Sequence, residues 1–100
     1  MDFFYGIYKQ GNEVLLAICD EDIVDKEFRC IERKIKIDVK KSFYGKNKGS
    51  KEDIIEFMKN ATILNLVGKE IISLAIEEGI IDKESVLTIG ETVHAQRAKM

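Results

Sequence analysis

Residues 61–79 read ATILNLVGKEIISLAIEEG, and their apolar side chains recur at intervals of three and four residues. This spacing lines one face of an α-helix, so we predict a helix over residues 62–78 that is the most buried element of the fold. Gly79 follows at the position where a left-handed residue ends many helices. Gly68 would then lie inside the helix at a cost of about 1 kcal/mol relative to alanine. We expect it to let a neighbouring strand or helix approach closely.

A second, shorter helix is predicted immediately upstream. Ser50, followed three residues later by Asp53, resembles a shortened capping box, and residues 54, 55, 57 and 58 supply an apolar stripe. Residues 60–62 offer a cap or a bend between the two helices. Before them, the segment KKSFYGKNKGS (residues 40–50) contains two glycines and is predicted to be a loop.

The rest of the chain has the composition of β-strands and turns. Four runs rich in aromatic and β-branched residues are predicted to form two hairpins: residues 3–8 with 14–19, and residues 86–89 with 93–97. Strict alternation over residues 31–39 predicts one further strand with one face on the core and one in water. Asp20 is expected to cap a short helical turn over residues 21–24.

We therefore predict an α+β fold in a single domain over residues 1–100. Its sheet is expected to be antiparallel and to have about five strands, two hairpins plus one strand, with two helices packed on one face.

The composition argues against several classes of protein. The chain has 100 residues, 45% of them hydrophobic, which suits one compact domain. Its apolar runs are far shorter than the roughly 20 residues of a membrane span, and Met1 is followed by an acid, so we expect a cytoplasmic protein without a signal peptide. Cys19 and Cys30 match neither a zinc spacing nor a disulfide framework, and we expect reduced thiols, no metal and no cofactor.

The charge is uneven although the net charge is only −2. Residues 31–51 carry eight bases against two acids, a net charge of +6, while the flanking segments carry −4 each. This segment also holds two aromatic rings, and cations for phosphates with rings for stacking suit single-stranded RNA. The predicted contacts are Lys40, Lys41, Phe43, Tyr44, Lys46 and Lys48. The alternative is a solvated strand face, and the overall acidity argues against avid nonspecific binding.

The predicted last strand carries a polar pair. His94, the only histidine, lies two residues before Gln96, so both side chains should point to the same face. Together with Asn65 and Gly68 they predict a small polar pocket, whose amide and imidazole groups suit binding more than bond cleavage. A second interpretation is that Asn65 only satisfies a backbone group in a loop.

The segments EVLLAICDEDI, FYG, NATILNLVGKEIISLAIEEGIID, VLTIG and HAQ occur in this order. In this respect the chain resembles a small archaeal family, the domain of unknown function 424. The features shared with that family look like the helix motif ATIxNxVG and the terminal HAQ, which include Asn65, Gly68, His94 and Gln96. The resemblance implies an archaeal source and a single domain, and it brings no reaction with it.

Three hypotheses about function follow. The first is a non-enzymatic binding module that contacts RNA or the translation apparatus through the basic-aromatic segment. The second is a protein for a small polar ligand, or an enzyme, centred on Asn65, His94 and Gln96 with Cys19 or Asp20. The third is a protein-interaction domain with an exposed strand edge.

Overall fold

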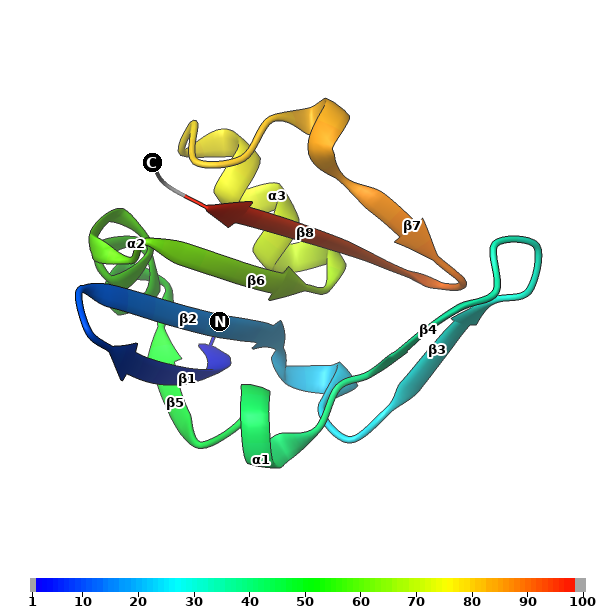
Figure 1. The fold of residues 1–100 in the computed structure, drawn as a ribbon, viewed down its shortest axis with the longest axis horizontal. Coiled ribbons are helices and arrows are strands. Elements are labelled where there is room, and N and C mark those ends of the chain that lie inside the picture. Colours follow the sequence, from blue (N-terminus) through cyan, green and yellow to red (C-terminus); the bar gives the residue numbers. More distant parts are fainter. Residues whose placement is uncertain (1, 99–100) are drawn as a thin grey trace.

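A computed structural model describes residues 2–98 of the chain. The strands are β1 (Asp2–Gln10), β2 (Glu13–Asp20), β3 (Glu27–Cys30), β4 (Ile35–Asp38), β5 (Asn47–Ser50), β6 (Ile63–Val67), β7 (Leu87–Ile89) and β8 (Thr92–Ala98). The helices are α1 (Lys41–Tyr44), α2 (Lys51–Asn60) and α3 (Lys69–Glu77), with 3-10 turns η1 (Glu21–Ile23) and η2 (Lys83–Ser85). The fold is α+β, as predicted, but the described residues form three helices, a six-stranded sheet and a two-stranded sheet (Figure 1).

The two predicted hairpins are confirmed. Strands β1 and β2 pair antiparallel from Phe3↔Asp20 to Gln10↔Glu13, and β7 pairs with β8 across the turn at Gly90. The predicted upstream helix is also confirmed as α2, and Ser50 caps it as expected: its Oγ atom accepts a hydrogen bond from the Asp53 amide at 3.3 Å. The six strands lie in the order β5-β1-β2-β6-β8-β7.

The predicted helix over residues 62–78 is wrong in its first half, where the chain forms β6. This strand pairs parallel with β2 and antiparallel with β8, so the sheet is mixed and not purely antiparallel. Leu64 and Leu66 face the helices, while Ile63 and Val67 face the other way. A strand whose two faces are both covered is apolar on both, and its sequence can therefore be mistaken for a broad helical stripe.

Gly68 joins β6 to α3 and is not inside a helix. Its φ of +123° is a conformation that residues with a Cβ rarely adopt, and a Cβ there would lie only 2.6 Å from Asp20 Oδ1. The Asp20 carboxylate accepts hydrogen bonds from the amides of Glu70 at 2.9 Å and Ile71 at 2.8 Å. Asp20 therefore caps α3, and the expected side-chain cap of the following turn is absent among the described residues.

Two further expectations for the middle of the chain are wrong. The alternation over residues 31–39 does not form one strand: residues 31–34 turn back, with Lys34 at φ +55°, and join β3 to β4. Ile31 is consequently 88% exposed. Residues 40–50 are not a plain loop either, because they contain α1 and β5. These elements of four residues depend on contacts with β1 that local sequence does not reveal.

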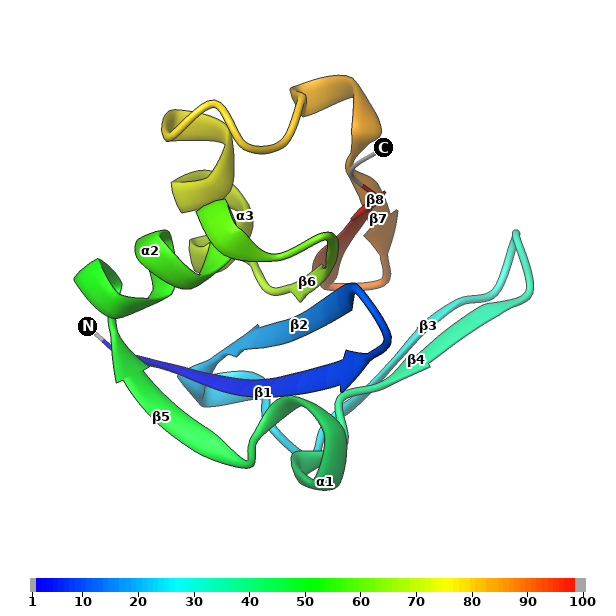
Figure 2. The same cartoon turned by 60° about the vertical axis from the view of Figure 1, so that its left-hand side comes forward.

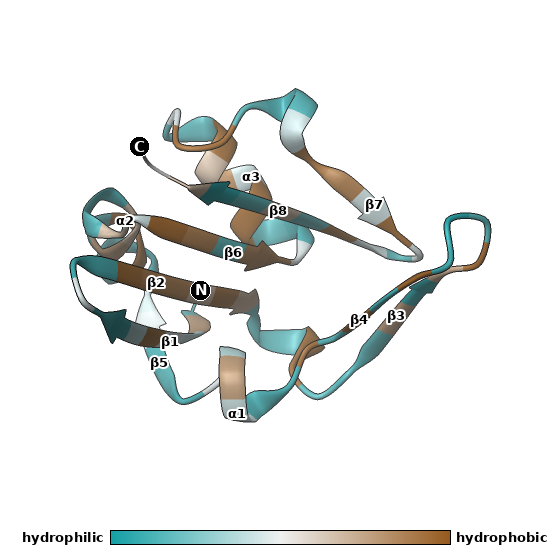
Figure 3. Cartoon of the chain, viewed as in Figure 1, coloured by the Kyte–Doolittle hydropathy of each residue, from teal (hydrophilic) through white to brown (hydrophobic). Residues whose placement is uncertain are grey.

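The sheet has one covered face and one partly open face. Helices α2 and α3 pack on the first, as predicted, and α1 lies on the other side with the β3–β4 hairpin (Figure 2). We call the side opposite α2 and α3 the open face. Strands β2 and β6 are hydrophobic along most of their length, whereas the second half of β8 is hydrophilic (Figure 3). Over residues 2–98, no helix has both the length and the hydropathy to cross a membrane.

Candidate functional site

A hydrogen-bonded cluster lies on the open face at the centre of the sheet. Tyr44 Oη donates to Asn65 Oδ1 at 2.7 Å, and His94 Nε2 lies 3.0 Å from the same oxygen. Asn65 pairs with Gln96 in the register of β6 and β8, and Val67 pairs with His94. The structure therefore brings together Asn65, His94 and Gln96, three of the four residues of the predicted pocket.

The cluster sets the tautomer of the His94 imidazole. An amide oxygen only accepts hydrogen bonds, so His94 Nε2 must donate its proton to Asn65 Oδ1. Burial lowers the pKa of His94 below its usual 6.5, which keeps the ring neutral and leaves Nδ1 as an acceptor. Within residues 2–98 neither His94 Nδ1 nor Asn65 Nδ2 has a protein partner, and neither is fully enclosed. One donor and one acceptor therefore reach solvent beside the exposed Gln96 side chain.

Tyr44 belongs to this cluster and not to the exposed basic surface. Its side chain is 4% exposed, and burial raises the pKa of the phenol to about 12, so the hydroxyl remains a donor. Phe43 packs edge-on against Tyr44 and stacks on Tyr8, with both centroid distances at 5.0 Å. Tyr8 Oη in turn donates to the Phe43 carbonyl at 2.6 Å. These contacts hold α1 against the sheet. Of the two predicted rings, Phe43 is half-buried and can still meet a base, whereas Tyr44 cannot.

The predicted lysines form a rim beside the open face. Lys40, Lys41, Lys46 and Lys48 are all exposed. Lys46 Nζ lies 4.9 Å from the centre of the Tyr8 ring, a cation–π distance. Lys48 forms an ion pair with Glu21, which offsets part of its charge. The rim is thus cationic mainly at Lys40, Lys41 and Lys46.

Gly68 is not part of the cluster, although it was predicted in the pocket. Its close contact is with Asp20, on the side of a hollow of about 260 Å³. This hollow is mainly acidic and is lined by Asp2, Phe3, Asp20, Glu21, Asp22 and Glu70. Negative charge there opposes the binding of phosphate.

The groups suggested for catalysis are poorly placed for it. Cys19 is buried, and burial together with the nearby Asp20 raises the pKa of its thiol to about 12, so it stays protonated. Burial also raises the pKa of the Asp20 carboxyl, and both of its oxygens are bonded to amides of α3. Among residues 2–98, no three His, Cys, Asp or Glu side chains are grouped to hold a metal ion. The cluster itself offers hydrogen bonds and no activated nucleophile.

Sequence reasoning missed the role of Tyr44 as the link between the two predicted surfaces. The phenol lies 21 residues before Asn65, in a segment that has no regular spacing to predict its direction. The only available signal was Asn65 itself, since a polar side chain on an otherwise apolar element requires a hydrogen-bond partner.

Comparisons with known proteins show the family and a solved structure of similar fold. No curated protein matches the chain significantly. A crystal structure of an uncharacterised conserved protein from Methanopyrus kandleri is similar, with a TM-score of 0.77 and 19% sequence identity, over 100% of this chain and 95% of the other. At that identity the likeness shows the fold alone. The family described as protein of unknown function (DUF424) matches residues 8–100, which confirms the resemblance predicted from the sequence, and the chain belongs to this family.

Proposed function

We propose that this protein is a non-enzymatic binding module that holds single-stranded RNA across the open face. The proposed class of ligand includes the RNA of the translation apparatus. The main support is the 2.7 Å hydrogen bond from Tyr44 to Asn65. It joins the basic segment, which supplies cations, to the pair Asn65 and His94, which supplies hydrogen-bonding atoms, so one ligand can contact both. Single-stranded RNA suits this combination, because cations hold its phosphates and its bases expose their edges.

The rim can supply the phosphate contacts. Lys40, Lys41 and Lys46 are exposed, and within residues 2–98 none of them is in an ion pair with a carboxylate. With so few cations, binding should be weak at physiological salt and should strengthen when the salt is lowered. Weak binding is also what the net charge of −2 of the whole chain predicts.

The surface around Asn65 suits an extended ligand. Leu15 and Ile63 are neighbours in the register of β2 and β6, and both are half-buried on the open face beside Asn65. Apolar side chains of this kind can pack against a sugar or a base, while the free Asn65 Nδ2 and His94 Nδ1 atoms hydrogen-bond to a base edge. The arrangement is a face and not an enclosed pocket.

The test is fluorescence anisotropy with a labelled single strand of about ten nucleotides, at about 50 mM and 200 mM salt. The wild-type protein should bind at low salt and lose affinity steeply. A triple variant, Lys40→Ala, Lys41→Ala and Lys46→Ala, should bind more weakly and with a smaller salt dependence. His94→Ala should bind more weakly with the salt dependence unchanged, because it removes a contact to a base and none to a phosphate.

A matched control removes three lysines elsewhere: Lys59→Ala, Lys69→Ala and Lys83→Ala. It should bind like the wild type, apart from a small effect of net charge. If the control and the rim variant lose affinity equally, binding is nonspecific. If no variant or wild-type protein binds RNA at low salt, the proposal fails.

A small polar ligand is the second candidate. The observation that favours it is the open donor and acceptor at Asn65 and His94, which a metabolite could also engage. A thermal-shift screen would show it as a ligand that raises the melting temperature of the wild type but not of His94→Ala. An equal response of the two proteins would count against this site.

A further inference from the structure

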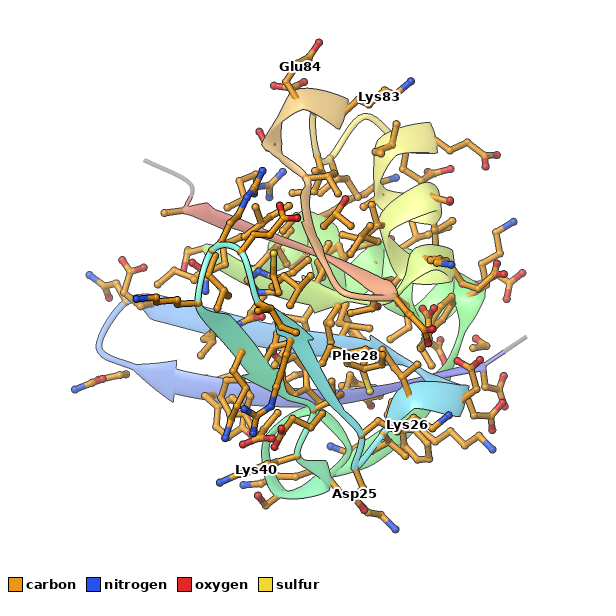
Figure 4. The ribbon with its side chains drawn as sticks, turned by 90° about the vertical axis from the view of Figure 1, so that its right-hand side faces the viewer. Asp25, Lys26, Phe28, Lys40, Lys83 and Glu84 are labelled. Carbon is orange, nitrogen blue, oxygen red and sulfur yellow. The ribbon has the colours of Figure 1, made fainter. Side chains whose placement is uncertain are left out.

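The β3–β4 hairpin, residues 27–38, stands out from the body of the protein, and we call it the arm (Figures 1 and 2). Its base is well anchored. Asp25 N donates to Val39 O at 2.6 Å and Val39 N donates to Lys26 O at 2.9 Å, while Phe28 and Ile37 pack into the core beneath the open face. Figure 4 looks at the molecule from the side of the arm, with Asp25 and Lys40 near its base. An isolated hairpin is only marginally stable in water, so this anchoring keeps the arm formed.

Charge is graded along the arm. The two acids Glu27 and Asp38 face each other at its base. Residues 29–36, the outer part, carry four bases and one acid. Arg29 donates to Glu27 at 2.6 Å, and Lys36 lies 3.5 Å from Glu27. The acids at the base are therefore paired with the inner bases, and the turn at the tip, residues 31–34, has two bases and one acid, a net charge of +1.

The tip combines this charge with an apolar side chain. Ile31 is 88% exposed, and Arg33 and Lys34 are exposed in the same turn. Exposed single hydrophobic residues are common on protein surfaces. Here the isoleucine lies at the end of a projecting hairpin, in the same turn as Glu32, Arg33 and Lys34, so an apolar side chain and two cations are presented together.

The orientation of the arm is set by a close contact with the turn between β7 and β8. A Cβ at Gly90 would lie 2.7 Å from the Arg29 carbonyl oxygen, so only glycine lets the arm rest there. A hollow of about 440 Å³ separates the outer arm from the end of β7 and is lined by Arg29, Cys30, Ile31, Glu32, Arg33, Thr88 and Gly90. His94 follows four residues after Gly90 on β8, so a ligand leaving the cluster along β8 approaches the arm.

We propose that the arm grips a double-helical RNA segment that adjoins the single strand on the open face. This inference rests on the proposed function and specifies its target as a junction between single-stranded and double-stranded RNA. The minor groove of an RNA duplex is wide and shallow, and it is lined on both sides by phosphates. The cations of the arm reach those phosphates, and Ile31 lies against sugars in the groove.

A duplex fits the arm better than a longer single strand does. A flexible strand would have to be ordered along the whole path to the tip, at a cost in conformational entropy for every nucleotide. A duplex is already rigid, so the contact at the end of the arm adds affinity without that cost. The positive charge of the tip favours acidic partners over basic ones, so acidic proteins are the competing class.

The experiment compares two labelled probes: a single strand of about ten nucleotides, and the same strand as a tail on a short RNA duplex. The wild type should bind the tailed duplex about tenfold more tightly than the strand, as expected for about two added phosphate contacts at low salt. The variant Arg33→Ala with Lys34→Ala should lose most of this preference and keep its affinity for the strand. Ile31→Ser should reduce the preference in the same way without changing the charge.

Lys59→Ala with Lys83→Ala is the matched control, since it removes two exposed lysines outside the arm and should keep the preference; Lys83 lies far from the arm in Figure 4. Equal binding of both probes by the wild type overturns the inference and leaves the proposed function standing. A tip variant that weakens both probes alike also overturns it. Failure of both probes to bind overturns the proposed function as well. Tip-dependent binding of poly-glutamate without a preference for the duplex assigns the arm to an acidic protein.

Discussion

Replacing Gly68 by alanine distinguishes the observed strand–helix junction from a continuous helix, because the two arrangements predict changes of opposite sign. In a helix interior, alanine is favoured over glycine by about 1 kcal/mol, so the variant would be stabilised. At the observed junction, φ is +123° and the added Cβ would lie 2.6 Å from Asp20 Oδ1, where real Cβ atoms essentially never approach closer than 3.0 Å.

Two costs contribute at the junction. The backbone conformation costs about 1–3 kcal/mol for a residue with a Cβ. Displacing the Asp20 carboxylate weakens its hydrogen bonds to the amides of Glu70 and Ile71, and losing a cap costs about 0.5–2 kcal/mol. The free energy of unfolding of Gly68→Ala should therefore fall by about 2–5 kcal/mol, a large share of the roughly 5–15 kcal/mol of a typical domain.

The assay is urea unfolding followed by circular dichroism, with two further variants. Gly79→Ala is the control, because Gly79 has φ +72° but no atom within 4 Å of the added Cβ, so only the backbone cost of about 1 kcal/mol applies. Asp20→Ala removes the carboxylate, so the double variant should be more stable than the sum of the single changes predicts. A stabilised Gly68→Ala, or strictly additive changes, would refute the junction. If Gly68→Ala alone does not fold, rescue by Asp20→Ala carries the test.

Three further predictions concern the site. Tyr44→Phe should lower the free energy of unfolding by about 1 kcal/mol, because Asn65 Oδ1 loses one donor; urea unfolding measures it, and no change would contradict a direct bond. An NMR titration should give the imidazole of His94 a pKa below its usual 6.5. The unfolded chain then binds the proton at a higher pH than the folded protein does, so the free energy of unfolding falls as the pH is lowered through 6.5. His94→Gln should remove that part of the pH dependence. The half-exposed Cys30 should react with a thiol reagent at once and the buried Cys19 only after unfolding, and rapid labelling of both would contradict the burial of Cys19 and the raised pKa of its thiol.

The elements that were predicted correctly have local signals. Two hairpins carry glycine turns between runs of strand-forming residues, and α2 begins at a serine cap whose hydrogen bond the structure contains. The elements that were missed lack such signals. The turn at residues 31–34 contains no glycine and places Lys34 at φ +55°, while the alternation of side chains continues through it. Strand β6 is largely apolar on both faces because α2 and α3 cover one face while α1 and the base of the β3–β4 hairpin cover part of the other, which is a property of the assembled fold.

The candidate cluster was anticipated partly for the wrong reason. Asn65 was expected on a helix, yet it lies on a strand, where the register places it opposite Gln96. The same-face argument for His94 and Gln96 holds because β8 is a strand, as predicted. Long-range contacts decided the rest: Tyr44 reaches Asn65 from α1, and Asp20 meets Gly68 from β2. Spacing along the chain contains no information about either contact.

Asn65 is the residue that a purely structural account explains least. It lies at the centre of the sheet, with Ala17 beside it on β2 and the exposed Gln96 beside it on β8. An aliphatic side chain there would pack without needing partners. Two donors, Tyr44 and His94, converge on its Oδ1 atom, and both would lose a partner if it were replaced. Its Nδ2 group has no protein partner within residues 2–98 and is not enclosed, so it can bind water or a ligand on the open face, as can the Nδ1 atom of His94. The cluster therefore leaves one donor and one acceptor available to a ligand on the open face, and the proposed function uses both.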